Sequence, residues 1–251
     1  MKKLNLASIA MAGALTVGSM FAVSATAQAE VSYNIGIHSK YLLRGIAEEN
    51  TGAAIQGGAD WSSDTSGWYA GWWFSSLSYS YEANADGKTD KKGFENDFYA
   101  GYAGEITESI GWDVGLIQYI YVDVDDSDLL EATGTLTFGD FYVGAQYLLQ
   151  DGWWGNAGDV YWKAGWSTDL SQGITLALDY GYYTYDKGDS AKIGGAGSTT
   201  SSGGFRHLNV TASKAIGKTG AEAYVQYTFA GEDRKGVDNN DSMVVGITYG
   251  F

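Results

Sequence analysis

The stretch that decides the fold reads MVVGITYGF and occupies residues 243–251. Apolar side chains stand at every second position from Met243 to Phe251, and Val244, Thr248 and two glycines stand between them. Because successive side chains of a β-strand point to opposite faces, this period of two predicts a strand with one continuous apolar face. The same period recurs along the chain, whereas no segment after Ala29 keeps a helical stripe or an apolar run long enough for a transmembrane helix.

Twelve segments show this strand pattern, and their connections alternate in length. The predicted strands span residues 31–44, 52–63, 67–80, 94–105, 109–123, 129–138, 140–150, 158–168, 173–186, 204–216, 220–231 and 241–251. Short connections near 63–66, 107, 139, 170 and 218 alternate with longer ones near 46–51, 82–93, 123–128, 151–157, 187–203 and 232–240. Bacterial outer-membrane barrels have this parity. We therefore predict an all-β protein, a transmembrane antiparallel up-and-down β-barrel of about twelve strands. Ten or fourteen strands would fit if one weak hairpin is misread, and the weakest pair spans 129–150.

The N-terminal residues have the pattern of a secretory signal peptide. Lys2 and Lys3 precede an apolar run from Ile9 to Val23, and Ala27-Gln28-Ala29 gives an A-x-A cleavage site. A membrane anchor is the weaker alternative, because this run is shorter than the ~20 residues of a spanning helix. We predict a signal peptide over 1–29 and a barrel over 30–251 in the outer membrane of a Gram-negative bacterium.

The net charge and the lack of cysteine limit the classes of molecule that the protein can bind. The formal net charge of −15 argues against nucleic acid, whose binding proteins neutralise phosphates with basic patches. The chain has no cysteine, so disulfides, thiolate catalysis and zinc–thiolate sites are excluded. We expect contact with outer-membrane lipid and lipopolysaccharide, since aromatic residues gather toward the ends of the predicted strands, as in interfacial girdles. The aromatic end at Phe251 resembles the C-terminal signature that the barrel-assembly machinery reads in such proteins.

If the apolar faces contact lipid, the opposite faces line the lumen. The predicted pore-lining residues are His38, Lys40, Arg44, Asp60, Glu95, Asp97, Asp113, Glu131, Asp159, Lys163, Asp179 and Glu222. Because this set is mostly acidic, the predicted function is a porin for passive diffusion of small polar solutes, with a preference for cations or neutral solutes. The alternative is a packed, non-conducting barrel that acts through its extracellular loops, in adhesion, phage reception or a structural role.

Catalysis and metal binding have weaker support. A serine hydrolase needs serine and histidine on one strand face. Ser39 directly follows His38 and so faces the other way, and Asn209 stands two residues after His207. The acidic stretch 123–128 has enough oxygen ligands for Ca²⁺ or Mg²⁺, but it lacks the glycine and terminal glutamate of an EF-hand loop. We expect no enzyme activity, no metal and no cofactor.

Several blocks of sequence occur in a recognisable order. They are SKYLLRG at 39–45, QGG at 56–58, GWYAGWW at 67–73, DFYAGY at 97–102 and DVGLI at 113–117, followed by Tyr119 and Tyr121. In order and spacing they resemble the TorF-type porin family of proteobacterial outer-membrane proteins, over roughly residues 30–185. The resemblance implies an outer-membrane porin. The chain departs from the family pattern after Tyr121, where Val122 and Asp123 replace an expected proline, which affects the shape of the third extracellular loop.

Arg44 is the one family-like residue that we single out. An inward arginine in a mostly acidic lumen could hold a constriction network, or it could form a simple salt bridge near the extracellular rim.

Overall fold

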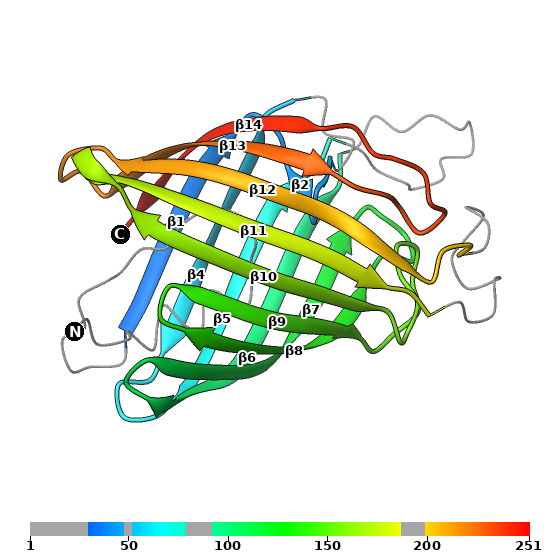
Figure 1. Ribbon diagram of the computed structural model, residues 1–251, viewed down its shortest axis with the longest axis horizontal. Coiled ribbons are helices and arrows are strands. Elements are labelled where there is room, and N and C mark those ends of the chain that lie inside the picture. The colour runs from blue at the N-terminus through cyan, green and yellow to red at the C-terminus, as the bar shows by residue number, and fades with distance from the viewer. Residues whose placement is uncertain (1–29, 48–51, 79–91, 187–198) are drawn as a thin grey trace.

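The computed structural model describes residues 30–47, 52–78, 92–186 and 199–251. The predicted signal peptide, 1–29, lies outside the described residues. Within these ranges, twelve antiparallel strands form one closed barrel and two short strands form a separate hairpin (Figure 1). The predicted twelve-stranded barrel is confirmed, and the weak pair over 129–150 is present as two paired strands.

Each barrel strand pairs with its neighbours in the sequence, and the first pairs with the last. The barrel strands are β1 (Glu30–His38), β4 (Ala54–Ser62), β5 (Trp68–Ser76), β6 (Phe94–Thr107), β7 (Ile110–Val122), β8 (Leu129–Phe138), β9 (Phe141–Leu148), β10 (Val160–Asp169), β11 (Ile174–Thr184), β12 (Gly203–Ala215), β13 (Ala221–Ala230) and β14 (Ser242–Gly250). The hairpin consists of β2 (Leu42–Leu43) and β3 (Ile46–Ala47), and the 3₁₀ turn η1 (Ser171–Gly173) joins β10 to β11. In the described part of the chain, no helix has the length and apolar character needed to cross a membrane.

The pairing of β1 with β14 closes the sheet. Ile35 lies opposite Tyr249 on β14 and opposite Gly57 on β4, so both edges of β1 are paired. The backbone of Tyr33 exchanges two hydrogen bonds with Phe251, of 2.9 and 3.0 Å, and the two rings stack with centroids 5.7 Å apart. A closed sheet leaves no unpaired strand edge, which is the condition for placing strands in lipid.

The outer face of the barrel is apolar. Alternate residues of 243–251 are exposed, from 44% at Tyr249 to 67% at Phe251, whereas Val244 between them is 2% exposed. The same alternation runs around the barrel, where exposed aliphatic residues include Ile35, Ile37, Val114, Leu116, Val143 and Val225. An apolar exterior on a closed barrel is the surface that lipid contact requires.

Glycine and tyrosine pair across neighbouring strands on the inner face. A Cβ atom on Gly71 would lie 2.4 Å from the ring of Tyr99, and one on Gly165 would lie 2.2 Å from the ring of Tyr142. These glycines leave room for tyrosine rings to lie flat along the wall. The arrangement explains why a chain with 36 Gly and 19 Tyr can build a barrel with large inward side chains.

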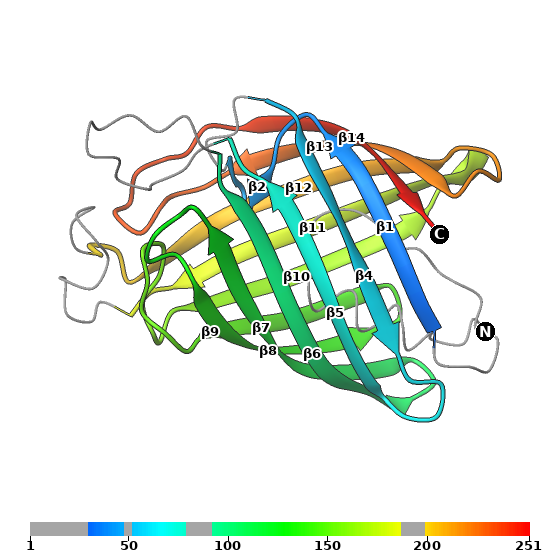
Figure 2. The same cartoon turned by 180° about the vertical axis from the view of Figure 1, so that it is seen from behind.

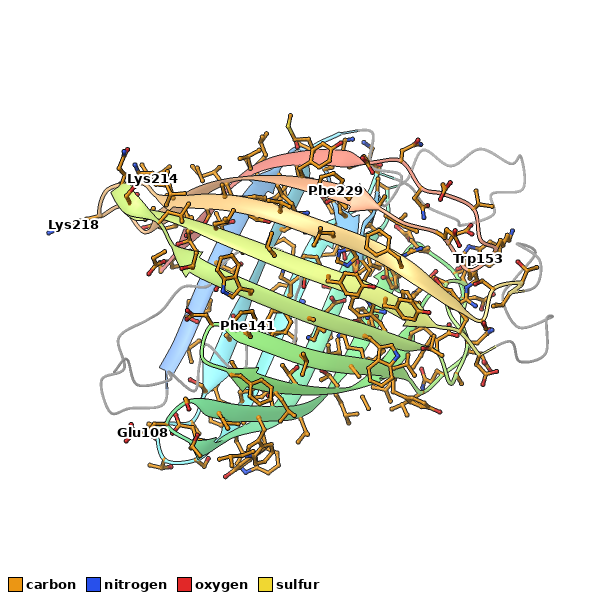
Figure 3. The ribbon with its side chains drawn as sticks, viewed as in Figure 1. Glu108, Phe141, Trp153, Lys214, Lys218 and Phe229 are labelled. Atoms are coloured by element: carbon orange, nitrogen blue, oxygen red, sulfur yellow. The ribbon has the colours of Figure 1, made fainter. Side chains whose placement is uncertain are left out.

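The two ends of the barrel differ. Short turns such as 108–109 and 139–140 lie at one end, called here the turn end, where the C-terminus also lies (Figure 2). The longer connections that the structure describes in full, 123–128, 149–159 and 231–241, lie at the opposite end, called the loop end. Glu108 and Lys218 project from the turn end, and Trp153 lies at the loop end (Figure 3). The predicted alternation of short and long connections therefore holds where the structure describes them, and the predicted connections near 46–51, 82–93 and 187–203 lie partly outside the described residues.

The first predicted strand, 31–44, is too long. β1 ends at His38, and the last backbone contact with β14 is Ser39 N donating to the Val245 carbonyl at 2.8 Å. Beyond it Tyr41 and Leu42 are both buried, although they are adjacent in sequence. Adjacent side chains of a wall strand face opposite ways, so this pair shows that the chain has left the wall and turned inward.

Replacing Gly71 with alanine is expected to lower the free energy of unfolding by about 1–3 kcal/mol, because the new methyl group overlaps the Tyr99 ring. Gly134→Ala is the matched control, since the nearest atom to its Cβ position is 3.9 Å away. Both variants are compared by denaturant titration of tryptophan fluorescence in detergent. Equal stability of the two would contradict the close Gly71–Tyr99 packing.

Candidate functional site

The segment 39–47 forms a hairpin inside the barrel. Its turn residues Arg44 and Gly45 have φ of +48° and +81°, the positive values of a type I′ turn. Glycine adopts this conformation freely, whereas an arginine adopts it only where its surroundings hold it. In both views β2 lies at the loop end within the outline of the barrel (Figure 1, Figure 2). We call residues 39–47 the inward hairpin.

Packing holds the inward hairpin against the wall. The Tyr41 hydroxyl donates to Glu95 Oε1 at 3.1 Å, and its ring lies 5.5 Å from that of Trp73. Leu42 packs with Tyr224 and Val244 on the other side. A Cβ on Gly45 would lie 2.4 Å from the Cβ of His207, so the turn presses directly on β12.

Arg44 forms the centre of the site and is 4% exposed. Its Nη2 donates to Glu131 Oε2 at 2.6 Å and to Gln146 Oε1 at 3.2 Å. Nη1 donates to the Tyr183 hydroxyl, and Nη2 also reaches the Tyr119 hydroxyl at 3.3 Å. Since Gln146 lies on β9, halfway around the strand order from β1, the inward hairpin crosses the lumen.

The surroundings keep Arg44 charged. Burial alone would lower the pKa of its guanidinium, but Glu131, followed by Tyr183 and Tyr119, raises that pKa above its ordinary value. The guanidinium also lies over the Tyr161 ring, 4.5 Å from the centroid, which adds a cation–π contact. The result is a cation fixed in the middle of the lumen by side chains from β7, β8, β9, β10 and β11.

The cations of the lumen wall lie on one side, whereas its carboxylates lie on both sides. Strands β4 to β8 contain acidic residues and no lysine or arginine within their bounds. Glu95 and Asp97 on β6 are 0% and 2% exposed, and the Tyr121 hydroxyl donates to Glu95 Oε1 at 3.0 Å. The cations of the lumen wall, Lys163 on β10 and Arg206 on β12, lie on the other side together with Asp179 and Glu222, and Lys214 on β12 is exposed outside the lumen.

The inward charged residues differ in exposure. Glu131 and Lys163, near the level of Arg44, are buried, whereas Asp60, Asp179 and Glu222, nearer the turn end, are partly exposed. The Tyr99 hydroxyl donates to Asp60 and the Tyr142 hydroxyl donates to Asp179, which holds these carboxylates along the wall. Polar side chains therefore line the lumen, some of them buried and some partly exposed, and the inward hairpin occupies its interior.

The predicted site residues fall into two groups. Three lie outside the strand wall: Lys40 and Arg44 belong to the inward hairpin, and Asp159 lies in the loop before β10, where Arg234 pairs with it. The remaining nine lie in barrel strands, on the inner face: His38, Asp60, Glu95, Asp97, Asp113, Glu131, Lys163, Asp179 and Glu222.

Sequence reasoning missed Arg206, Arg234, Tyr119 and Tyr161. Arg206 had one usable signal: it follows Phe205 and precedes His207, where strict alternation would place it on the lipid face. The other three carry no such signal, because contacts between distant strands bring them to Arg44 or to Asp159.

The alternatives of catalysis and metal binding gain no support in the described ranges. His38 Nδ1 and His207 Nε2 each share a hydrogen bond of 2.8 Å with a tyrosine hydroxyl, of Tyr224 and Tyr161 respectively, and in the described residues neither imidazole is hydrogen-bonded to a serine. Among the residues described, no three His, Cys, Asp or Glu side chains are placed to hold a metal ion. In the acidic stretch 123–128, Asp128 instead accepts the backbone N–H of Tyr121 at 2.7 Å.

Comparison with known proteins gives a family and a fold. The model of the family described as "Bacterial protein of unknown function (Gcw_chp)" matches residues 22–188. No curated protein matches the sequence. Among solved structures, the KdgM porin is similar at a TM-score of 0.53 and 10% identity, covering 88% of this chain and 98% of its own. OprD from Pseudomonas aeruginosa has a TM-score of 0.41 and 12% identity, covering 88% and 65%. The likeness to KdgM concerns the fold.

Arg44→Gln is expected to lower the free energy of unfolding by about 3–5 kcal/mol, because it leaves the buried Glu131 carboxylate without its cation. Adding Glu131→Gln should restore much of this loss, since the uncompensated charge is then gone. A double-mutant cycle from denaturant titrations measures the coupling. Lys214→Gln, an exposed change on β12, is the control. Additive losses from the two substitutions would show that the ion pair is not coupled.

Proposed function

The chain belongs to the Gcw_chp family of bacterial proteins, and from its barrel geometry we propose that it is a narrow porin of the Gram-negative outer membrane. It would admit small polar solutes by passive diffusion. The supporting observation is the inward hairpin, which places the charged Arg44 at the centre of a polar lumen inside an apolar barrel. A hairpin that only stabilised the fold would gain little from a charge there, since burying an ion pair rarely stabilises more than apolar packing does.

The proposal also includes how the protein reaches the outer membrane and what it contacts there. Residues 1–29 would direct export and be removed, and residues 30–251 would insert as the barrel. The aromatic end of β14, with Phe251 exposed, would be read by the assembly machinery, and the exterior would contact lipid and lipopolysaccharide. The TorF-type resemblance agrees with this proposal, as does the presence of a porin among the proteins that share the fold.

The excess of carboxylates on the inner wall supports a preference for small cations over simple anions, or for neutral solutes. The inward carboxylates, Asp60, Glu95, Asp97, Asp113, Glu131, Asp179 and Glu222, outnumber the lumen cations Arg44, Lys163 and Arg206, which would give the lumen a negative potential. The partly exposed Asp60, Asp179 and Glu222 would keep this potential in contact with water. At the level of the inward hairpin the passage would be narrow enough for solute size to matter.

The second candidate is a non-conducting barrel that acts through its loops. The observation in its favour is burial: Glu131 and Lys163 are 1% and 4% exposed beside the inward hairpin. A plugged lumen at that level would carry no current. Conduction decides between the two candidates.

The deciding experiment is single-channel recording of refolded residues 30–251 in a planar bilayer under a KCl gradient. We expect discrete current steps with a reversal potential that favours K⁺. Arg44→Ala should raise the conductance and strengthen the preference for K⁺, because it removes both bulk and positive charge from the narrowest level.

Lys214→Ala is the control, since this lysine is exposed outside the lumen and should leave conductance unchanged. A silent bilayer from protein that is folded, as shown by heat-modifiable migration in gels, would exclude the porin and favour the second candidate. Equal currents from Arg44→Ala and the wild type would remove the inward hairpin from the solute path.

A further inference from the structure

The chain has three arginines, and all three lie against the same tyrosine stack. The rings of Tyr161 and Tyr183 have centroids 5.2 Å apart, and those of Tyr183 and Tyr185 have centroids 5.0 Å apart. Arg44 lies over Tyr161, at 4.5 Å from the centroid; Arg206 lies over Tyr183, at 5.7 Å; Arg234 lies over Tyr185, at 4.8 Å. The stack runs from the loop-end mouth to the inward hairpin along one side of the lumen.

Two of these arginines already have carboxylate partners. Arg44 is paired with Glu131, and Arg234 is paired with Asp159. Arg206 is different: its Nε donates to the carbonyl of Arg44 at 3.1 Å, and its Nη1 donates to the carbonyl of Glu232 at 3.3 Å. Among the described residues it has no carboxylate within ion-pair distance, and its side chain is half-buried. Two neutral carbonyls orient the guanidinium and leave its charge unmatched.

A β-bulge directs Arg206 to this place. Gly181 pairs with His207 and the next residue, Tyr182, pairs with Phe205, so Arg206 is the extra residue of β12. Without the bulge, alternation would put the side chain that precedes His207 on the lipid face. Bulges that redirect one side chain are common beside functional sites.

We propose that Arg206, with the Tyr183–Tyr185 stack beside it, forms a subsite for the carboxylate group of a small organic solute on its way to the inward hairpin. Arginine presents a planar pair of donors that fits a carboxylate, and the tyrosine faces suit a flat or apolar remainder of the solute. This inference rests on the proposed function and names the solute class that the lumen would take.

The distribution of charge in the lumen indicates which carboxylate-bearing solutes would fit. A solute with a single carboxylate would bind Arg206 but would meet the acidic side formed by β4 to β8. A zwitterion would place its ammonium group toward that side and its carboxylate on Arg206. The shared chemistry is the carboxylate, and the two kinds of solute are separated by experiment.

The test measures binding rather than current, so its result does not depend on whether the barrel conducts ions. Refolded residues 30–251 in a non-ionic detergent are titrated by calorimetry with benzoate, with phenylalanine as a zwitterion, and with benzamide as the uncharged analogue. We expect benzoate or phenylalanine to bind at least about tenfold more tightly than benzamide, from one charge-assisted pair. Tighter binding of phenylalanine than of benzoate identifies zwitterions as the class, and the reverse order identifies simple acids.

Arg206→Gln should weaken the carboxylate probes about tenfold and leave benzamide unchanged, whereas Lys214→Gln on the same strand should change neither. Because Arg206 also holds the backbone of Arg44, Arg206→Lys is a second variant that keeps the charge, and it should retain part of the binding. Equal affinity for benzoate, phenylalanine and benzamide, or equal affinity in wild type and Arg206→Gln, would overturn the subsite. Binding without current would reject the porin and keep the subsite.

Discussion

The closed backbone ladder is the constraint on which the rest of the structure depends. In lipid every backbone N–H and C=O must be paired within the protein, so the sheet has to return on itself and β1 has to meet β14. Closure leaves each wall side chain only two directions, lipid or lumen. The polar residues of a strongly acidic chain are thereby collected inside the barrel, and the protein has to accommodate their charge there.

The inward hairpin supplies a cation that neutralises part of the charge inside the barrel. Arg44 is supplied from a turn and not from a wall strand, so its guanidinium reaches the far side of the lumen and pairs with Glu131 on β8. A wall residue on β1 would not reach that carboxylate. Tyrosine hydroxyls supply the other donors, and the cross-strand glycines give their rings room to lie along the wall. Arg44 and the tyrosine hydroxyls thus donate hydrogen bonds to the lumen carboxylates, and the glycines make room for the tyrosine rings.

Local patterns predicted the barrel because strand alternation and turn parity are local properties. Residues 243–251 alone indicate which face meets lipid, and the twelve segments follow from repeating the same rule. The position of Arg44 could not be read in this way. The alternating sequence pattern extends the first strand to residue 44. Only the burial of both Tyr41 and Leu42, which is a tertiary property, shows that the chain has left the wall. Arg206 was missed because a bulge shifts the pairing by one residue, and this shift depends on the partner strand.

The three arginines differ in whether a carboxylate of the protein neutralises them. Lysines and carboxylates occur along the whole chain, but the three arginines gather on one tyrosine stack. Arg44 and Arg234 each neutralise a buried carboxylate, of Glu131 and Asp159 respectively. Among the described residues no carboxylate pairs with Arg206, so the same argument does not account for it, and a bulge sets its position. A charge that is positioned at the mouth of the lumen, and for which the described part of the chain supplies no counter-ion, is best explained by a group that arrives from outside.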